Sequence, residues 1–161
     1  MKLRLICAIA CAALFASFAS AQQPAANNAQ SNSVSQPQDS HATVYVYRYK
    51  QFVGKALSPS VYCDDSELAR MENGRFFVVT LPPGNHVFRS NDKQAGVAVD
   101  LKAGEKYYVR VEIATGFMKG HGRVLSVPPD QGSYEIKKLK PLDSDKVKDT
   151  QHVTLALAAA N

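Results

Sequence analysis

Residues 107–113, YYVRVEI, carry the clearest structural pattern in the chain. Every second side chain is aromatic or β-branched, whereas the positions between them include Arg110 and Glu112. A period of two is that of an extended strand, in which successive side chains point to opposite faces. The segment therefore predicts a β-strand with one face in a core.

Similar runs lie on both sides of this segment. Longer runs cover 43–49, 76–81, 86–89 and 97–101, and shorter ones cover 60–64, 123–127 and 134–139. Turn residues separate them, as at Pro82-Pro83-Gly84-Asn85, while residues 68–71 fit either a helical turn or a short strand. Because no helical pattern of about 10–15 residues intervenes, the expected fold class is all-β, an antiparallel β-sandwich of about seven strands over residues 42–140.

Residues 1–21 predict a secretory signal peptide. Lys2 and Arg4 precede an apolar run at 5–18, and Ala19-Ser20-Ala21 fits a signal peptidase site, so we expect cleavage between Ala21 and Gln22. A retained membrane helix is the alternative, but it needs about 20 apolar residues. The mature chain is therefore expected to have no transmembrane span.

A lipoprotein attached through Cys11 is a second alternative for the N-terminus. The apolar stretch before Cys11 would be shorter than the roughly 7–15 residues that such a signal needs, and Ala8 stands where Leu is usual. We therefore expect an exported protein, periplasmic or secreted, without a lipid anchor.

The segments that flank the predicted domain have a different composition. Residues 22–41 are rich in Gln, Asn and Ser and cannot bury enough apolar surface to offset the entropy of ordering, which predicts a disordered linker. Residues 141–161 form a C-terminal tail whose apolar end, 153–160, is too short to span a bilayer. This tail is frayed, forms a short helix packed on the domain, or docks on a partner, and the sequence does not choose among the three.

The order of several motifs is similar to that of a bacterial family. The motifs are VYVYRY at 44–49, NGRFFVV at 73–79, LPPGNH at 81–86 and LKAGEKYYVRV at 101–111. Over residues 42–140 they resemble the family known as domain of unknown function 2846. The resemblance implies a prealbumin-like β-sandwich on exported proteins or lipoproteins, and it implies no established activity and no functional residues to carry over.

Histidine and cysteine spacing does not match a known metal or catalytic motif. The chain has His41, His86, His121 and His152, and none forms an HxH or HxxxH pair or accompanies a CxxC. Signal cleavage leaves Cys63 alone, so no intramolecular disulfide is expected. We therefore expect no catalytic residues, no metal site and no cofactor.

Cys63 and the acidic residues after it have structural interpretations. Asp64 and Asp65 would raise the thiol pKa, whereas a reactive thiolate needs positive potential, so Cys63 is expected to be a buried strand residue. Residues 64–67 lack the spacing of a calcium loop and are expected to form a solvated turn.

The glycine-rich segment 116–122 is the first candidate for a partner contact. It lacks the Gly-Lys-Ser/Thr ending of a phosphate loop, but loops at the ends of sandwiches often carry binding surfaces. The candidate contact residues are Phe117, Met118, Lys119 and His121.

Charge suggests classes of partner. The chain carries 19 Lys and Arg against 14 Asp and Glu, a net charge of +5, and the basic excess lies in the predicted domain. Lys137, Lys138 and Lys140 cluster near its end, where they either protect an edge strand or meet anionic lipid, acidic polymer or another protein. Nucleic acid is not expected as a partner because no recognition motif is present. The sequence gives no signal for an oligomeric state.

Two function hypotheses follow. The first is an exported, non-catalytic β-sandwich module that binds or scaffolds an unknown protein or polymer in the bacterial cell envelope. The alternative is an envelope hydrolase whose site is assembled from distant strands around His86 or His121. The enzyme hypothesis requires a histidine within hydrogen-bonding reach of a nucleophile or a carboxylate.

Overall fold

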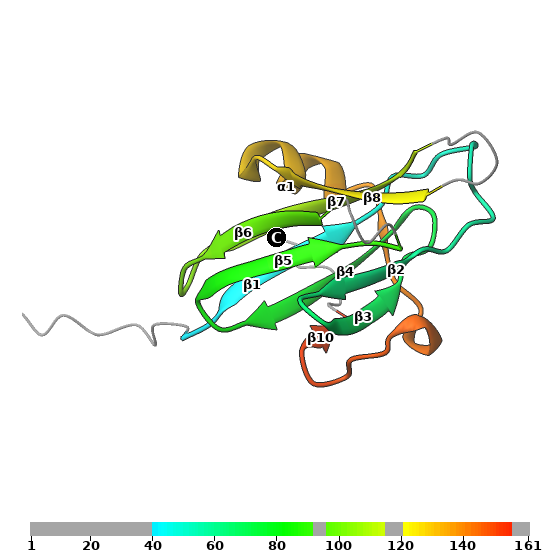
Figure 1. Cartoon of the computed structure of the whole chain (residues 1–161). Coiled ribbons are helices and arrows are strands. Elements are labelled where there is room, and N and C mark those ends of the chain that lie inside the picture. Colours follow the sequence, from blue (N-terminus) through cyan, green and yellow to red (C-terminus); the bar gives the residue numbers. More distant parts are fainter. Residues whose placement is uncertain (1–39, 92–95, 115–120, 156–161) are drawn as a thin grey trace, which may run out of the picture. The chain divides into compact units, whose positions relative to one another are not determined.

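The structure, a computed structural model, describes residues 40–91, 96–114 and 121–155. Within them, two β-sheets pack as a sandwich, with β3, β2, β5 and β6 in one layer (Figure 1). The all-β fold class is thus confirmed. The strands are β1 (Ala42–Tyr47), β2 (Ser60–Cys63), β3 (Ser66–Arg70), β4 (Arg75–Leu81), β5 (Gly84–Arg89), β6 (Gly96–Leu101), β7 (Lys106–Ala114), β8 (His121–Val127), β9 (Lys140–Pro141) and β10 (Val153–Thr154).

The larger sheet is mixed rather than purely antiparallel. Its order is β10-β4-β1-β7-β8, with β9 also on β4, and β1 pairs antiparallel with β4 but parallel with β7. Parallel strands need a long crossover, which is usually a helix. Here the chain between β1 and β7 forms β2 and β3, and then β5 and β6, in the other sheet, so no crossover helix is needed. The absence of a helical pattern therefore did not exclude parallel strands, and the prediction of a wholly antiparallel sandwich was wrong.

The main core lies between the two sheets and follows the predicted alternation. Val44 and Val46 of β1 are fully buried, and their neighbour Val79 on β4 belongs to the same cluster. A second cluster lies on the other face of the larger sheet and includes Tyr47, Phe76 and Tyr108. The run 76–79 is therefore buried on both faces, which explains why it is apolar at every position.

A helix replaces the strand expected at 134–139. Helix α1 (Pro129–Ile136) begins with a proline, which is compatible with the first turn, and Ile136 and Leu139 pack together against the second cluster. The Leu139 amide donates to the Ile136 carbonyl in the turn after the helix, and both side chains reach this cluster. Gly132 lets the helix approach the sheet, since a Cβ there would lie 2.3 Å from Cγ of Tyr108.

The described part of the C-terminal tail packs on the domain. Leu142 and Val153 are core residues, and β10 extends the larger sheet beside β4. Between them runs a short 3-10 helix, η1 (Ser144–Lys146), and the amides of Lys148 and Asp149 donate to the carbonyl of Leu68. Packing thus continues past the expected limit at 140, and the short strand β3 settles the ambiguity at 68–71.

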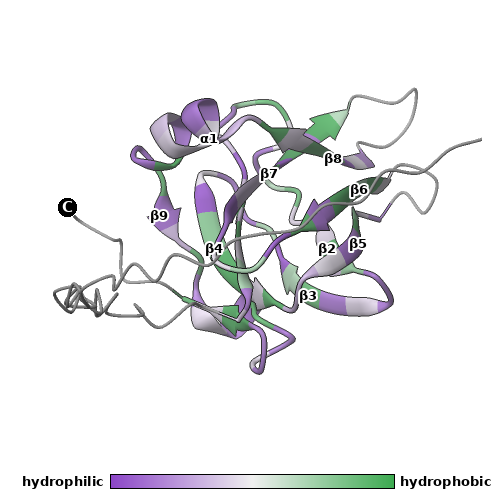
Figure 2. Ribbon diagram, turned by 90° about the vertical axis from the view of Figure 1, so that its left-hand side faces the viewer, coloured by the Kyte–Doolittle hydropathy of each residue, from purple (hydrophilic) through white to green (hydrophobic). Residues whose placement is uncertain are grey.

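Helix α1 and β9 are mostly hydrophilic, whereas strands such as β4 carry both hydrophilic and hydrophobic residues (Figure 2). Among the described residues, no helix is long and apolar enough to cross a membrane.

Candidate functional site

Several residues singled out in the sequence lie outside the described ranges. These are Cys11, Ala21, Gln22, Phe117, Met118 and Lys119. His121, the remaining candidate of the glycine-rich segment, is exposed at the first position of β8. The structure places His86 differently, because it brings this side chain to a thiol and a carboxylate.

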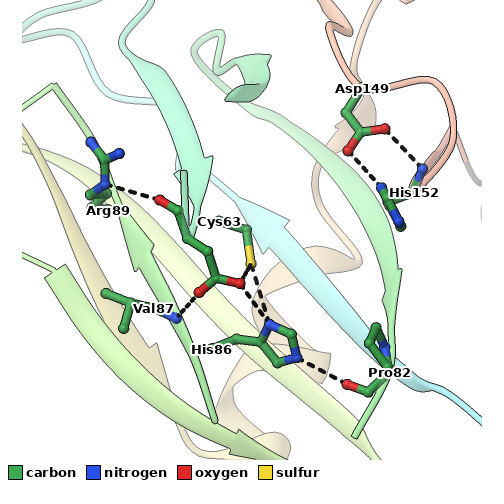
Figure 3. Close-up of polar contacts among 8 residues, drawn as sticks. Cys63, Pro82, His86, Val87, Arg89, Asp149 and His152 are labelled. Atoms are coloured by element: carbon green, nitrogen blue, oxygen red, sulfur yellow. Dashed lines mark hydrogen bonds and ion pairs between the residues drawn. The ribbon is translucent and has the colours of Figure 1, made fainter. Parts of the chain in front are cut away.

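Cys63, Asp64 and His86 form a compact polar cluster (Figure 3). The His86 Nδ1 atom lies 2.9 Å from Oδ2 of Asp64 and 3.9 Å from Sγ of Cys63, and Sγ lies 3.8 Å from the same carboxylate oxygen. Cys63 is 4% exposed, as the sequence predicted. The side chains of His86 and Asp64 are 14% and 51% exposed, so the cluster opens to solvent on the Asp64 side.

Strand pairing explains why these residues meet. β2 and β5 are antiparallel neighbours with Cys63 opposite Phe88, and His86 shares the inward face of β5 because it lies two positions before Phe88. Asp64 begins the tight turn to β3 with a φ of 51°, a left-handed conformation that Asp tolerates better than most residues. Its amide donates to the carbonyl of Val87, which ties the turn to β5.

Further hydrogen bonds orient the polar groups. The Nε2 atom of His86 lies 3.0 Å from the carbonyl oxygen of Pro82, and the amide of Val87 donates to Oδ1 of Asp64 at 2.9 Å. Arg89 donates from Nε to the carbonyl oxygen of Asp64. Residues of β5 and of the β4–β5 connection therefore fix the orientation of His86 and Asp64.

The electrostatics of the cluster disfavour a free thiolate. Burial, followed by the charge of Asp64, raises the pKa of Cys63 to about 12, in the direction expected from the sequence. Burial also acts to raise the pKa of Asp64, but hydrogen bonds from the Val87 amide and His86 outweigh it, so the pKa of this carboxyl is lowered. Cys63 is thus a poor nucleophile.

The arrangement also differs from a catalytic triad. In a triad, one imidazole nitrogen faces the nucleophile and the other faces the carboxylate. Here Nδ1 of His86 faces both Cys63 and Asp64, while Nε2 faces a main-chain carbonyl. A relay of protons from Cys63 through His86 to Asp64 has no path in this geometry.

Sequence reasoning missed this cluster because it tested only short spacings. Cys63 and His86 are separated by 23 positions, and their proximity depends on the β2–β5 register. The available signals were the alternation of β5, which puts His86 on the face of Phe88, and the turn at Asp64.

A second notable surface is the 50–57 loop between β1 and β2. Phe52 is 93% exposed and Val53 is 60% exposed, and Lys50 and Lys55 flank them in the sequence. Arg48, fully buried at the base of the loop, donates from its two terminal nitrogens to the carbonyl oxygens of Leu57 at 2.5 Å and Gly54 at 2.7 Å.

A cleft of about 240 Å³ lies beside this loop. Its lining residues are Lys50, Lys55, Ser58, Glu72, Asn73 and Arg75. Three cations and one carboxylate give the cleft a basic character, next to the apolar tip of the loop. The combination of exposed apolar groups and basic groups is one that anionic lipid surfaces bind.

Comparisons with known proteins found a matching family and a relative. A family model described as a protein of unknown function (DUF2846) matches residues 38–123, just over half of the chain. A relative from Haemophilus influenzae, described as an uncharacterized protein, is 28% identical over 126 residues, which cover 75% of this chain and 74% of the relative. No solved structure matches. The family match contains the 50–57 loop and the Cys63 cluster and ends before α1.

Proposed function

The chain belongs to the DUF2846 family, whose function is unknown, and from that premise we propose that it is an exported, non-catalytic β-sandwich module that attaches to anionic lipid surfaces of the bacterial cell envelope. The observation that carries the proposal is the exposure of Phe52 and Val53 between Lys50 and Lys55. Covering a large apolar side chain that is 93% exposed with a membrane or a partner lowers the free energy of the system.

The expected attachment is weak and reversible. Burying Phe52 in the interface contributes about 1.5–3 kcal/mol, and each lysine near an anionic surface contributes about 1 kcal/mol. These terms describe a peripheral contact rather than an anchor. The buried Arg48 supports it by holding the loop in one conformation, which reduces the entropy lost on binding.

We expect the Phe52→Ser variant to bind vesicles of anionic phosphatidylglycerol at least about tenfold more weakly than the wild type, because about 1.4 kcal/mol or more of apolar burial is lost. Co-sedimentation with vesicles measures the partition coefficient. Val53→Ser should also weaken binding, whereas Val87→Ser, the same change at an exposed position on β5, should not.

The contribution of the lysine charges to vesicle binding is tested in the same assay. Lys50→Glu and Lys55→Glu should reduce binding to anionic vesicles, and Lys102→Glu in the β6–β7 turn should have a smaller effect. Added salt should weaken wild-type binding. Equal binding to neutral phosphatidylcholine vesicles, or an unchanged Phe52→Ser variant, would refute the lipid assignment and direct attention to a protein or polymer partner.

Export itself makes a separate prediction. Mass spectrometry of the protein purified from the producing bacterium should find a mature N-terminus at Gln22, because signal peptidase cleaves after the small residue Ala21. A diacylated Cys11 would instead identify a lipoprotein.

The hydrolase alternative has less support in the geometry. His86 meets the requirement for a nearby carboxylate, but its contacts with Cys63 and Asp64 share one nitrogen. His121 is exposed at the start of β8. For this reason we assign the module a binding role rather than a catalytic one.

A further inference from the structure

We propose that Cys63, Asp64 and His86 form a binding site for a divalent transition-metal ion of the zinc class. Three different donor atoms, Sγ, Oδ2 and Nδ1, converge where β2 ends beside β5 (Figure 3). Thiolate, imidazole and carboxylate are the ligands that Zn²⁺ uses in proteins. This site lies on β2 and β5 and is independent of the lipid-binding proposal.

The distances fit a tetrahedral ion after small shifts. Metal bonds of about 2.3 Å to sulfur and about 2.0–2.2 Å to nitrogen and oxygen place sulfur about 3.6 Å from the other two donors and place nitrogen about 3.4 Å from oxygen. The corresponding separations here are 3.9, 3.8 and 2.9 Å. Each side of the triangle therefore needs to change by no more than about 0.5 Å.

The surrounding hydrogen bonds are those of a metal-binding histidine. A metal-bound imidazole usually gives its other N–H to a carbonyl or a carboxylate, which fixes the ring and the tautomer. Nε2 of His86 faces the carbonyl oxygen of Pro82 at 3.0 Å, so the neutral ring can present its lone pair at Nδ1. Asp64 is oriented in a similar way, because Oδ1 accepts from Val87 and Oδ2 faces the other two donors.

Metal binding at the three groups balances without a redox partner. An incoming ion takes the place of the Cys63 thiol proton and binds His86 as the neutral ring, with the ring proton on Nε2. The S–H bond breaks, metal bonds to sulfur, nitrogen and oxygen form, the thiol proton leaves to solvent, and no oxidation state changes.

Charge and access are also suitable. The thiolate of Cys63 and the carboxylate of Asp64 supply two negative charges that neutralise a divalent cation beside the neutral imidazole. Asp64 is half exposed, so an ion can reach the three donors from solvent. Arg89 is directed to the main-chain carbonyl of Asp64 and pairs with Asp65, rather than with the donor oxygen.

The chain offers a matched control in the pair formed by Asp149 and His152. His152 Nδ1 lies 2.7 Å from Oδ2 of Asp149, much as His86 lies beside Asp64. The other oxygen, Oδ1, accepts from the amides of Gln151 and His152. The charge of Asp149 reaches Cys63 and adds to the rise of its pKa, but among the described residues no cysteine completes a group of three donors at this pair.

The test uses the purified protein with Zn²⁺ or Co²⁺ as the probe. Competition with a chromophoric chelator should give one Zn²⁺ per chain, and bound Co²⁺ should show a thiolate charge-transfer band. Cys63→Ser should abolish that band. Cys63→Ser and His86→Gln should each weaken Zn²⁺ binding by more than the roughly 10–100-fold that loss of a supporting contact costs. His152→Gln should change it less than twofold.

Asp64→Asn isolates the carboxylate, because Asn also tolerates the positive φ at this turn, and it should weaken binding while preserving the fold. X-ray absorption on zinc-loaded wild type needs no variant and should show one sulfur at about 2.3 Å. Absence of the sulfur, a Co²⁺ complex without the charge-transfer band, or equal losses in His86→Gln and His152→Gln would overturn the proposal.

Discussion

Glu135→Ala is expected to lower the free energy of unfolding by about 3–5 kcal/mol, the cost of removing one partner from a buried charged network. Glu135 is buried on α1 and accepts hydrogen bonds from Tyr47, Gln131 and Arg110. Its loss leaves the fully buried Tyr47 hydroxyl without this acceptor and releases α1 from the sheet. Urea denaturation followed by circular dichroism measures the change.

Glu112→Ala is the control for this prediction. Glu112 pairs with the same Arg110, at 2.7 Å, but about a third of its side chain is exposed. Exposed ion pairs contribute about 0–1 kcal/mol, so the control should cost about 1 kcal/mol or less. Equal losses of unfolding free energy in the two variants would mean that the lost ion pair with Arg110, and not the buried position of Glu135, causes the loss of stability.

The same residue gives a pH dependence. Burial acts to raise the pKa of Glu135, but hydrogen bonds, first among them that from Tyr47, outweigh it and lower its pKa below the ordinary value. A carboxyl with a depressed folded-state pKa contributes stability above its unfolded pKa, about 4.3, and loses it as pH falls through the folded value. The stability difference between wild type and Glu135→Gln should therefore shrink below about pH 4.

Much of the sandwich could be predicted because strand alternation is a local property. The segments 107–113 and 76–81 carry their own burial pattern, and both became strands. Strand direction is not local, so the parallel β1–β7 pair had no signature in either segment. The segment 134–139 is too short to distinguish the period of a helix from that of a strand. The proline before α1 was the better indication of a helix.

The candidate site was less predictable for a related reason. His86 and Cys63 carry their chemistry in the sequence, but only the β2–β5 register brings them within 3.9 Å. Arg48 is similar, because it continues an alternating strand and gives no sign that it will be buried. Its partners are carbonyls of a loop whose path no short motif specifies.

Arg48→Ala is expected to lower the free energy of unfolding by at least about 2 kcal/mol and to open the 50–57 loop. Hydrogen bonds from a charged donor contribute about 1.5–3 kcal/mol each, and part of this is offset by the cost of burying a cation. The main chain at the exposed Lys50 and Lys55 then becomes mobile enough to enter the active site of trypsin. Because cleavage follows the population of the open loop, each 1.4 kcal/mol of lost local stability should accelerate it about tenfold.

Arg48→Met separates anchoring from packing. Methionine keeps much of the apolar stem, so Arg48→Met should lose less global stability than Arg48→Ala, although the bonds to Leu57 and Gly54 are lost in both variants. We expect rapid trypsin cleavage at the loop and weaker vesicle binding even though Phe52 is unchanged. If Arg48→Met resists trypsin as the wild type does, packing of Gly54 against Ile113, and not the guanidinium, holds the loop in place.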